Sequence, residues 1–158
     1  HRAFIELDIH GAASNVFQKL ARQMLVLNPN DNHDFRSSLS TSFLETAQPQ
    51  LVVALSADYP DDFCTLTLNN ILALIQLERR GEALTALNKT AIHHQVAITT
   101  LLAAKSKKPK FSMSGLQLGG KEEAFLYREA HLHLWKANDA LGWLRDAWRS
   151  IPNKKQRR

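Results

Sequence analysis

Histidines are the residues of this sequence that most readily suggest chemistry, because four of the seven stand in two close pairs. The pairs are His93-His94 and His131-x-His133. Imidazole is the commonest metal ligand in proteins. Chelation from one helix, however, needs ligands four residues apart, whereas neighbours one or two positions apart point roughly 100° or 200° away from each other. We therefore predict no metal site in this chain.

Cys64 is the single cysteine, and its sequence neighbours decide whether a nucleophilic role is credible. It lies in DDFCTLTL, beside the acidic pair Asp61-Asp62 rather than beside a cation that would stabilise a thiolate. We expect an ordinary, half-buried thiol. A lone cysteine forms no intrachain disulfide, which is typical of a reducing compartment, and we expect a cytoplasmic protein.

The paired carboxylates Asp61-Asp62 and Glu122-Glu123 invite a general acid and base interpretation. Both pairs lie at expected helix starts, where negative charge complements the positive end of the helix dipole. Nor does the sequence contain G-x-S-x-G, G-x-x-x-x-G-K-[ST] or G-x-G-x-x-G. We therefore predict that the chain is not an enzyme, with no catalytic residue and no cofactor.

The net charge of +5 is concentrated in two short segments, KSKKPK at 105–110 and NKKQRR at 153–158. Without them the chain has a small acidic excess. Basic segments can contact phosphates without sequence preference. These two lack interleaved aromatic residues, and the acidic body offers no supporting stripe. Nucleic-acid association through the loop 105–110 and the tail 154–158 is therefore the alternative function, and not the preferred one.

Apolar residues recur at three- and four-residue spacing through the first part of the chain, which predicts helices rather than strands. One helix begins near residue 14 and ends at Asn28-Pro29, and a second, capped by Asp31 or Asn32, ends at Gln48-Pro49. A shorter helix over 50–60 ends at Tyr59-Pro60. The apolar stripes of the first two helices are Val16, Phe17, Leu20, Met24 and Leu27, then Phe35, Leu39, Phe43 and Leu44.

The remaining segments predict further helices separated by one long connection. Asp61-Asp62 begin a helix that continues to about Arg79, and a turn at Gly81 folds 82–94 back on it. A short helix over 96–104 precedes an extended connection over 105–120. Helices over 121–137 and 140–151 follow, the last capped by Asn138 or Asp139. The stripe of the returning helix is Ala83, Leu84, Leu87, Ala91 and Ile92.

The chain is therefore predicted to be one all-α domain of about seven helices over 13–152, with an N-terminal extension over 1–12 and a disordered basic tail over 153–158. No apolar run reaches the roughly 18 to 20 residues that cross a membrane, so we expect a soluble protein. Because the chain begins with His1 rather than Met, we expect it to be part of a longer product. Residues expected to be largely buried are Leu74, Leu77, Ala83, Leu84, Leu87, Tyr127, Leu134, Trp135, Leu141 and Leu144.

A repeat is visible in the residues that end one predicted helix and begin the next. LNPNDNHDF and DYPDDFCTL share a Pro-x-Asp motif at Pro29 and Pro60, about 31 residues apart, which is close to the period of helix-turn-helix repeats. LNPND, YPDD and ALIQLERRGEALTALNKTAI resemble the degenerate repeats of tetratricopeptide-repeat-like proteins. Together with GGKEEAFLYREAHLHLWKANDALGWL, their order is similar to the repeat region of the suppression-of-tumorigenicity-like group and its uncharacterised bacterial relatives. The resemblance covers residues 13 to 144.

The resemblance implies a right-handed array of antiparallel helical hairpins whose concave face takes a peptide or helix of a partner protein. We therefore expect a non-catalytic interaction scaffold. Polar residues on the first helices of the hairpins line the concave side in proteins of this type, so we expect Arg36, Asn69, Asn70 and Gln76 to contact the partner. The alternative for Asn69-Asn70 is that they only hydrogen-bond between packed helices.

Overall fold

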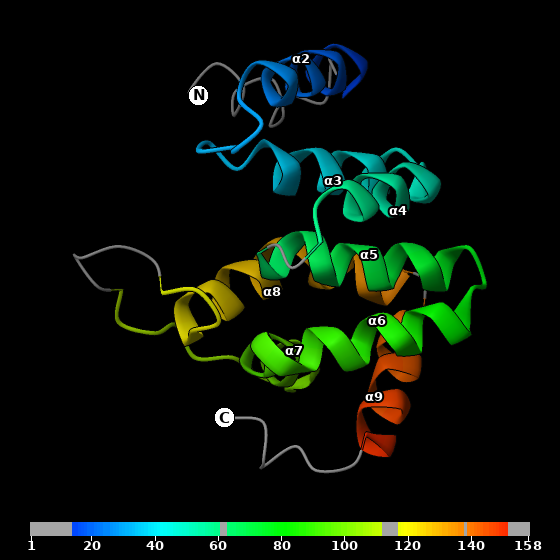
Figure 1. The fold of residues 1–158 in the computed structure, drawn as a ribbon. Coiled ribbons are helices and arrows are strands. Elements are labelled where there is room, and N and C mark those ends of the chain that lie inside the picture. The colour runs from blue at the N-terminus through cyan, green and yellow to red at the C-terminus, as the bar shows by residue number, and fades with distance from the viewer. Residues whose placement is uncertain (1–13, 61–62, 112–116, 138, 152–158) are drawn as a thin grey trace.

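The computed structural model describes residues 14–60, 63–111, 117–137 and 139–151 (Figure 1). The predicted all-α class is confirmed, since these ranges contain helices and no strand. The extension 1–12, the pair Asp61-Asp62, Asn138 and the tail 153–158 lie outside the described residues. The eight helices described, where about seven were expected, are α2 (Ser14–Leu27), α3 (Phe35–Glu45), α4 (Pro49–Asp58), α5 (Cys64–Gln76), α6 (Arg80–His93), α7 (Gln95–Leu102), α8 (Lys121–Ala137) and α9 (Ala140–Ser150).

Helix α5 lies at the centre of the fold, in contact with α3, α4, α6 and α8. Figure 1 shows α3 and α4 above it and α6 below it, running back in the opposite direction. The sequence of α5 explains this position, because completely buried residues lie on opposite sides of the helix, Leu66 and Ala73 on one and Leu68, Ile71 and Leu72 on the other. A helix that is apolar nearly all round must be surrounded by other elements.

The capping role predicted for Asp31 is confirmed, although the residue at the N-cap position of α3 is Asp34. Its buried carboxylate accepts hydrogen bonds from the backbone N–H groups of Phe35, at 2.7 Å, and Arg36, at 2.9 Å. The Arg36 side chain donates a third bond through Nε, also at 2.9 Å. Asp31 therefore satisfies otherwise unpaired N–H groups at the start of α3 and holds Arg36 at the same time.

The predicted turn at Gly81 is wrong by about three residues. Helix α5 ends at Gln76, before the expected end at Arg79, and α6 already begins at Arg80. The turn is made by Glu78, whose φ of 58° lies in the left-handed region, and Gly81 belongs to the first turn of α6. Glutamate is not a residue that marks left-handed turns, so sequence pattern favoured the glycine instead.

The burial expected for the central and C-terminal helices is largely confirmed. Leu74, Ala83, Leu87, Tyr127, Trp135 and Leu144 are buried, while Leu77, Leu134 and Leu141 are half-buried. The prediction was wrong for Leu84, and the wider stripes were wrong at Val16, Leu27 and Ile92, which are all exposed. Helix α2 packs mainly on α3 and helix α6 mainly on α5, so each buries a narrower face than the stripe drawn for it.

The long connection between α7 and α8 is without helix in its described residues, 103–111 and 117–120, as predicted. Gly119 has a φ of 70°, and a Cβ there would come within 2.9 Å of the His93 carbonyl oxygen. This connection therefore lies directly against the end of α6. Within the part of the chain that the structure describes, no helix has both the length and the apolar character needed to cross a bilayer.

Candidate functional site

A groove of about 910 Å³ runs along helix α5, and we call it the α4–α6 groove. Its floor is formed by Thr67, Asn70 and Leu74 of α5, and its walls are formed by α4 and α6. Both walls contain a small exposed residue, Ala57 on α4 and Thr85 on α6. Its floor is thus partly apolar and its rim polar, an arrangement common in ligand sites.

Asn70 is one of the four residues predicted to contact a partner, and it lines this groove. Its Oδ1 atom is buried and has no hydrogen-bond partner among the described residues. An unsatisfied buried acceptor costs about 1 to 3 kcal/mol, which a donor from a bound molecule would recover. Asn70 is therefore the residue of the groove with the clearest capacity to bind a ligand.

Arg36, the second of these residues, lines one end of the same groove. Its Nε lies 2.9 Å from the Asp31 carboxylate, and its guanidinium carbon lies 4.7 Å from the centre of the Tyr59 ring. The ion pair and the cation–π contact hold the side chain in one place. Arg36 thus has a structural role in addition to its position at the groove.

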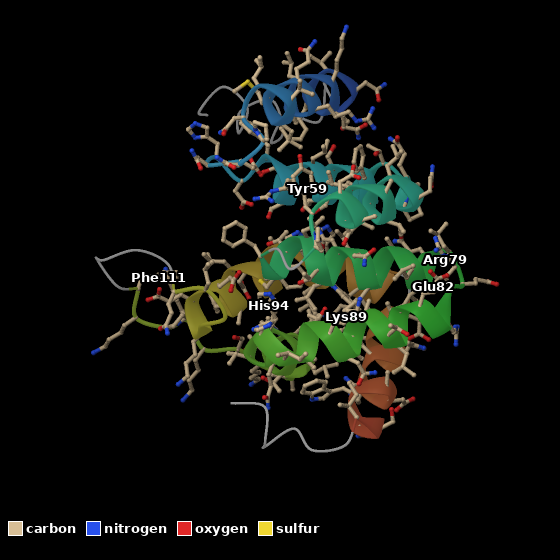
Figure 2. The ribbon with its side chains drawn as sticks, viewed as in Figure 1. Tyr59, Arg79, Glu82, Lys89, His94 and Phe111 are labelled. Atoms are coloured by element: carbon tan, nitrogen blue, oxygen red, sulfur yellow. The ribbon has the colours of Figure 1, made fainter. Side chains whose placement is uncertain are left out.

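Helix α6 contributes a row of polar side chains to the groove wall. Figure 2 shows Glu82, Lys89 and His94 spaced along α6 from the turn that follows α5 to the junction with α7. Glu82 is bound by Arg79, with 2.6 Å between Nη2 and Oε2. Thr85, Lys89 and His93 follow at four-residue spacing, and this polar stripe is the signal by which sequence reasoning could have found the wall.

Asn69 faces away from this groove, although it is adjacent to Asn70. It is completely buried, and its Nδ2 donates to Ser40 Oγ at 2.9 Å and to Thr41 Oγ1 at 3.2 Å. Its Oδ1 accepts from the Tyr127 hydroxyl at 3.1 Å. For Asn69 the alternative of a hydrogen bond between packed helices is therefore correct, because side chains one position apart on a helix point about 100° apart.

The Asn69 hydrogen bonds belong to a larger buried polar network that joins α3, α5 and α8. Trp135 Nε1 donates to the Tyr127 hydroxyl at 2.8 Å, and the Tyr127 ring is stacked on His131 with 4.4 Å between ring centroids. Burial lowers the pKa of His131 to about 4, so the ring is neutral at pH 7. The Tyr127 carbonyl can only accept, so Nδ1 of His131 donates to it at 2.9 Å and Nε2 accepts from Thr41 at 2.8 Å.

Glu123 of α8 stabilises the start of α5, which sequence analysis did not anticipate. Its carboxylate accepts from the Cys64 N–H at 3.1 Å and from the Gly119 N–H at 2.6 Å. The carboxylate therefore complements the N-terminus of a neighbouring helix as well as lying in the first turn of its own. The expectation that Cys64 is half-buried was wrong, because its side chain is completely buried at this helix start.

The surroundings of the Cys64 thiol disfavour the thiolate form that a nucleophilic cysteine requires. Burial first, and then the nearby Glu123 carboxylate, raise the pKa of the thiol far above its ordinary value. The thiol is therefore protonated at neutral pH, whereas nucleophilic cysteines have a depressed pKa. We assign Cys64 to the core.

A second groove, of about 700 Å³, lies between α3 and α8 beside the start of α5, and we call it the α3–α8 groove. It lies over part of the buried network, since Thr41, Tyr127 and His131 reach it from beneath. Ser37 and Glu123 also line it. Of the four predicted partner contacts, Arg36 and Asn70 share the α4–α6 groove, Asn69 is internal, and the half-buried Gln76 lines neither groove.

The two histidines of each pair differ in their exposure to solvent. His93 is exposed and His94 buried, while His131 is buried and His133 exposed. Among the described residues, no three His, Cys, Asp or Glu side chains are grouped so that they could hold a metal ion.

Comparison of the chain with protein-family models, with curated proteins and with solved structures finds no match.

Proposed function

We propose that this chain is a non-catalytic protein-binding module that holds a peptide segment of a partner protein in the α4–α6 groove. The observation that carries the proposal is the buried Asn70 Oδ1, which has no donor among the described residues and belongs to a side chain on the groove floor. A backbone N–H of an extended peptide is a donor that every partner sequence supplies. Binding would thus supply the hydrogen bond that the described part of the chain does not give to Oδ1.

The dimensions of the groove suit a short extended peptide. Its α6 wall runs from Glu82 to His94, which corresponds to about 18 Å at the helical rise per residue. An extended chain covers that length with about five or six residues. The small side chains of Ala57 and Thr85 leave space between the walls for peptide side chains.

We further propose that the helices form a tetratricopeptide-like right-handed array, in which α3–α4, α5–α6 and α8–α9 are the hairpins. The contacts of α3 with α5 and of α5 with α8 support this arrangement, because the first helices of successive hairpins would lie side by side. The repeated Pro-x-Asp motifs support it too, since Pro29 and Pro60 precede α3 and α5. Under this proposal α7 continues the second helix of the middle hairpin, and its contact with α8 fits that role.

Nucleic-acid association is the second candidate, and the connection before α8 is the observation in its favour. Lys105, Lys107, Lys108 and Lys110 are all exposed there, and Phe111 beside them is 42% exposed. The ammonium group of Lys108 lies 5.9 Å from the centre of the Phe111 ring. Such a cluster favours contact with phosphates, which is strongly weakened by salt.

Matched tryptophan variants of α4 test the peptide-binding proposal. Ala57 and Ala54 are both exposed on this helix, but only Ala57 lines the groove. The full-length tagged protein is isolated from its own cells at moderate salt, and the co-purifying proteins are quantified. We expect Ala57→Trp to reduce recovery of a specific partner about tenfold and Ala54→Trp to leave it unchanged. Equal recovery with both variants would contradict the proposal, and recovery that is lost with nuclease or salt would favour the second candidate.

A further inference from the structure

The α3–α8 groove has a charge opposite to that of the basic connection nearby. Its charged lining residues are Asp34 and Glu123, and no lysine or arginine is among the described residues that line it. His131 adds no positive charge, because burial lowers its pKa to about 4. The groove therefore has a negative potential at neutral pH.

Ser37 provides an independent indication that this groove holds a ligand. It lines the groove, is only 6% exposed, and its Oγ has no hydrogen-bond partner in the described part of the chain. Neighbouring hydroxyls differ, since Ser40 and Thr41 both donate within the protein. A buried hydroxyl without a partner is a position where a ligand donor or acceptor would gain a hydrogen bond.

Exposed apolar side chains line the same groove beside these polar groups. Leu118 is 60% exposed and Leu126 is 46% exposed, and the half-buried Phe63 also contributes to the lining. A ligand that satisfies the whole groove must therefore have a cationic head that donates hydrogen bonds and an apolar chain of several carbons. A protonated alkylamine has both features, and so does a lysine side chain.

We propose that the α3–α8 groove binds an aliphatic primary ammonium group, with the ammonium at Asp34 and Ser37 Oγ and the alkyl chain across Leu118 and Leu126. Glu123 adds negative charge, but its oxygens already accept hydrogen bonds from Cys64 and Gly119. Asp34 is exposed at the rim, where a ligand can approach its carboxylate from solvent. The two grooves share Phe63 and Leu118, but Asp34 and Ser37, which hold the ammonium group, line only the α3–α8 groove. The site does not depend on the function proposed for the α4–α6 groove.

Hexylammonium is the probe that tests this site, with hexanoate and hexanol as controls of equal chain length. Binding is measured from shifts of the backbone amide resonances of the intact protein. We expect hexylammonium to bind with a roughly millimolar dissociation constant, as befits so small a ligand, and to shift residues of α3 and of the first half of α8. Hexanoate should not bind. Equal shifts with hexanoate or hexanol, or no binding of hexylammonium, would overturn the proposal.

Three variants connect binding to the residues named. Asp34→Asn removes the charge and retains a side chain suited to the left-handed φ of 58° at this position, and it should weaken hexylammonium binding about threefold to fivefold. Ser37→Ala should weaken it about threefold without loss of stability. Asp58→Asn, the matched control, removes an exposed carboxylate outside both grooves and should have no effect. Equal weakening by Asp34→Asn and Asp58→Asn would refute a specific site.

The source of the ammonium group is distinguished with a blocked lysine, acetyl-lysine methylamide, as second probe. If it binds in the same groove as hexylammonium, the site accepts a lysine side chain of a peptide. If only hexylammonium binds, the flanking peptide groups are excluded and the ligand is a free amine. Both results support an ammonium site, and the control ligands and variants decide whether it exists.

Discussion

Replacing Asn69 with alanine should destabilise the domain by about 3 kcal/mol. The buried side chain makes three hydrogen bonds, to Ser40 Oγ, Thr41 Oγ1 and the Tyr127 hydroxyl. Each contributes about 1 kcal/mol net, and their loss leaves buried groups on α3 and α8 without this partner. For a chain of this size the melting temperature should fall by roughly 6 to 12 °C.

Asn70→Ala is the matched control, because it changes the same residue type one position along α5. The Oδ1 atom of Asn70 has no hydrogen-bond partner in the described residues, so its removal should not destabilise the domain and should stabilise it by up to about 1 kcal/mol. Unfolding in urea, followed by circular dichroism, measures both variants. A double-mutant cycle of Asn69→Ala with Tyr127→Phe should give a coupling energy of about 1 kcal/mol. Equal losses for the two asparagines, or a neutral Asn69→Ala, would refute the assignment of one to the network and the other to the groove.

Three further predictions concern other parts of the fold. Burial lowers the pKa of His131 to about 4, below the ordinary value near 6.5, so the unfolded chain takes up the proton first as pH falls. Urea titrations should show stability decreasing by up to about 3 kcal/mol between pH 6.5 and 4, and His131→Gln should remove most of this dependence. Glu123→Ala should lower the free energy of unfolding by about 2 kcal/mol, because the start of α5 loses its hydrogen-bond acceptor. The same change should accelerate modification of Cys64 by a thiol reagent. An unchanged modification rate would contradict this role of Glu123. Glu78→Gly should stabilise the domain by about 1 kcal/mol, because Glu78 has a left-handed φ that glycine adopts without strain. Gly81→Ala should also stabilise the domain slightly, because Gly81 is a helical position with free space around it. A large loss of stability in Gly81→Ala would show that the turn is at Gly81 instead.

The helices could be predicted from the sequence because their signals are local. Asn28-Pro29 and Gln48-Pro49 interrupt the apolar periodicity at points where helices end or begin in the structure, and Asp31 caps α3 as expected. The turn at Glu78 was missed because no local signal marks a left-handed glutamate. The turn was predicted at the nearby Gly81 because glycine is the usual residue in the left-handed conformation.

The candidate site was predicted only in part, because it depends on which side of each helix meets another. Asn69 and Asn70 are adjacent residues of the same type, so the sequence does not distinguish them. Only the packing of α5 against four other helices places one side chain in the core and the other in a groove. Glu123 likewise stabilises a helix 59 residues away, which periodicity cannot indicate. Arg36 was named because it lies on the first helix of a predicted hairpin, whereas its ion pair with Asp31 was not anticipated.

Site-specific photo-crosslinking from α6 tests most directly whether the α4–α6 groove holds a partner protein. A photoreactive amino acid is placed at Thr85, which lines the groove, or at Ile92, which is exposed on the same helix outside it. The full-length protein is irradiated in its own cells, and the adducts are identified by mass spectrometry. We predict that Thr85 forms an adduct with a peptide of one partner protein and that Ile92 does not. Equal adducts from both positions, adducts with nucleic acid alone, or none from Thr85 would contradict the proposed function.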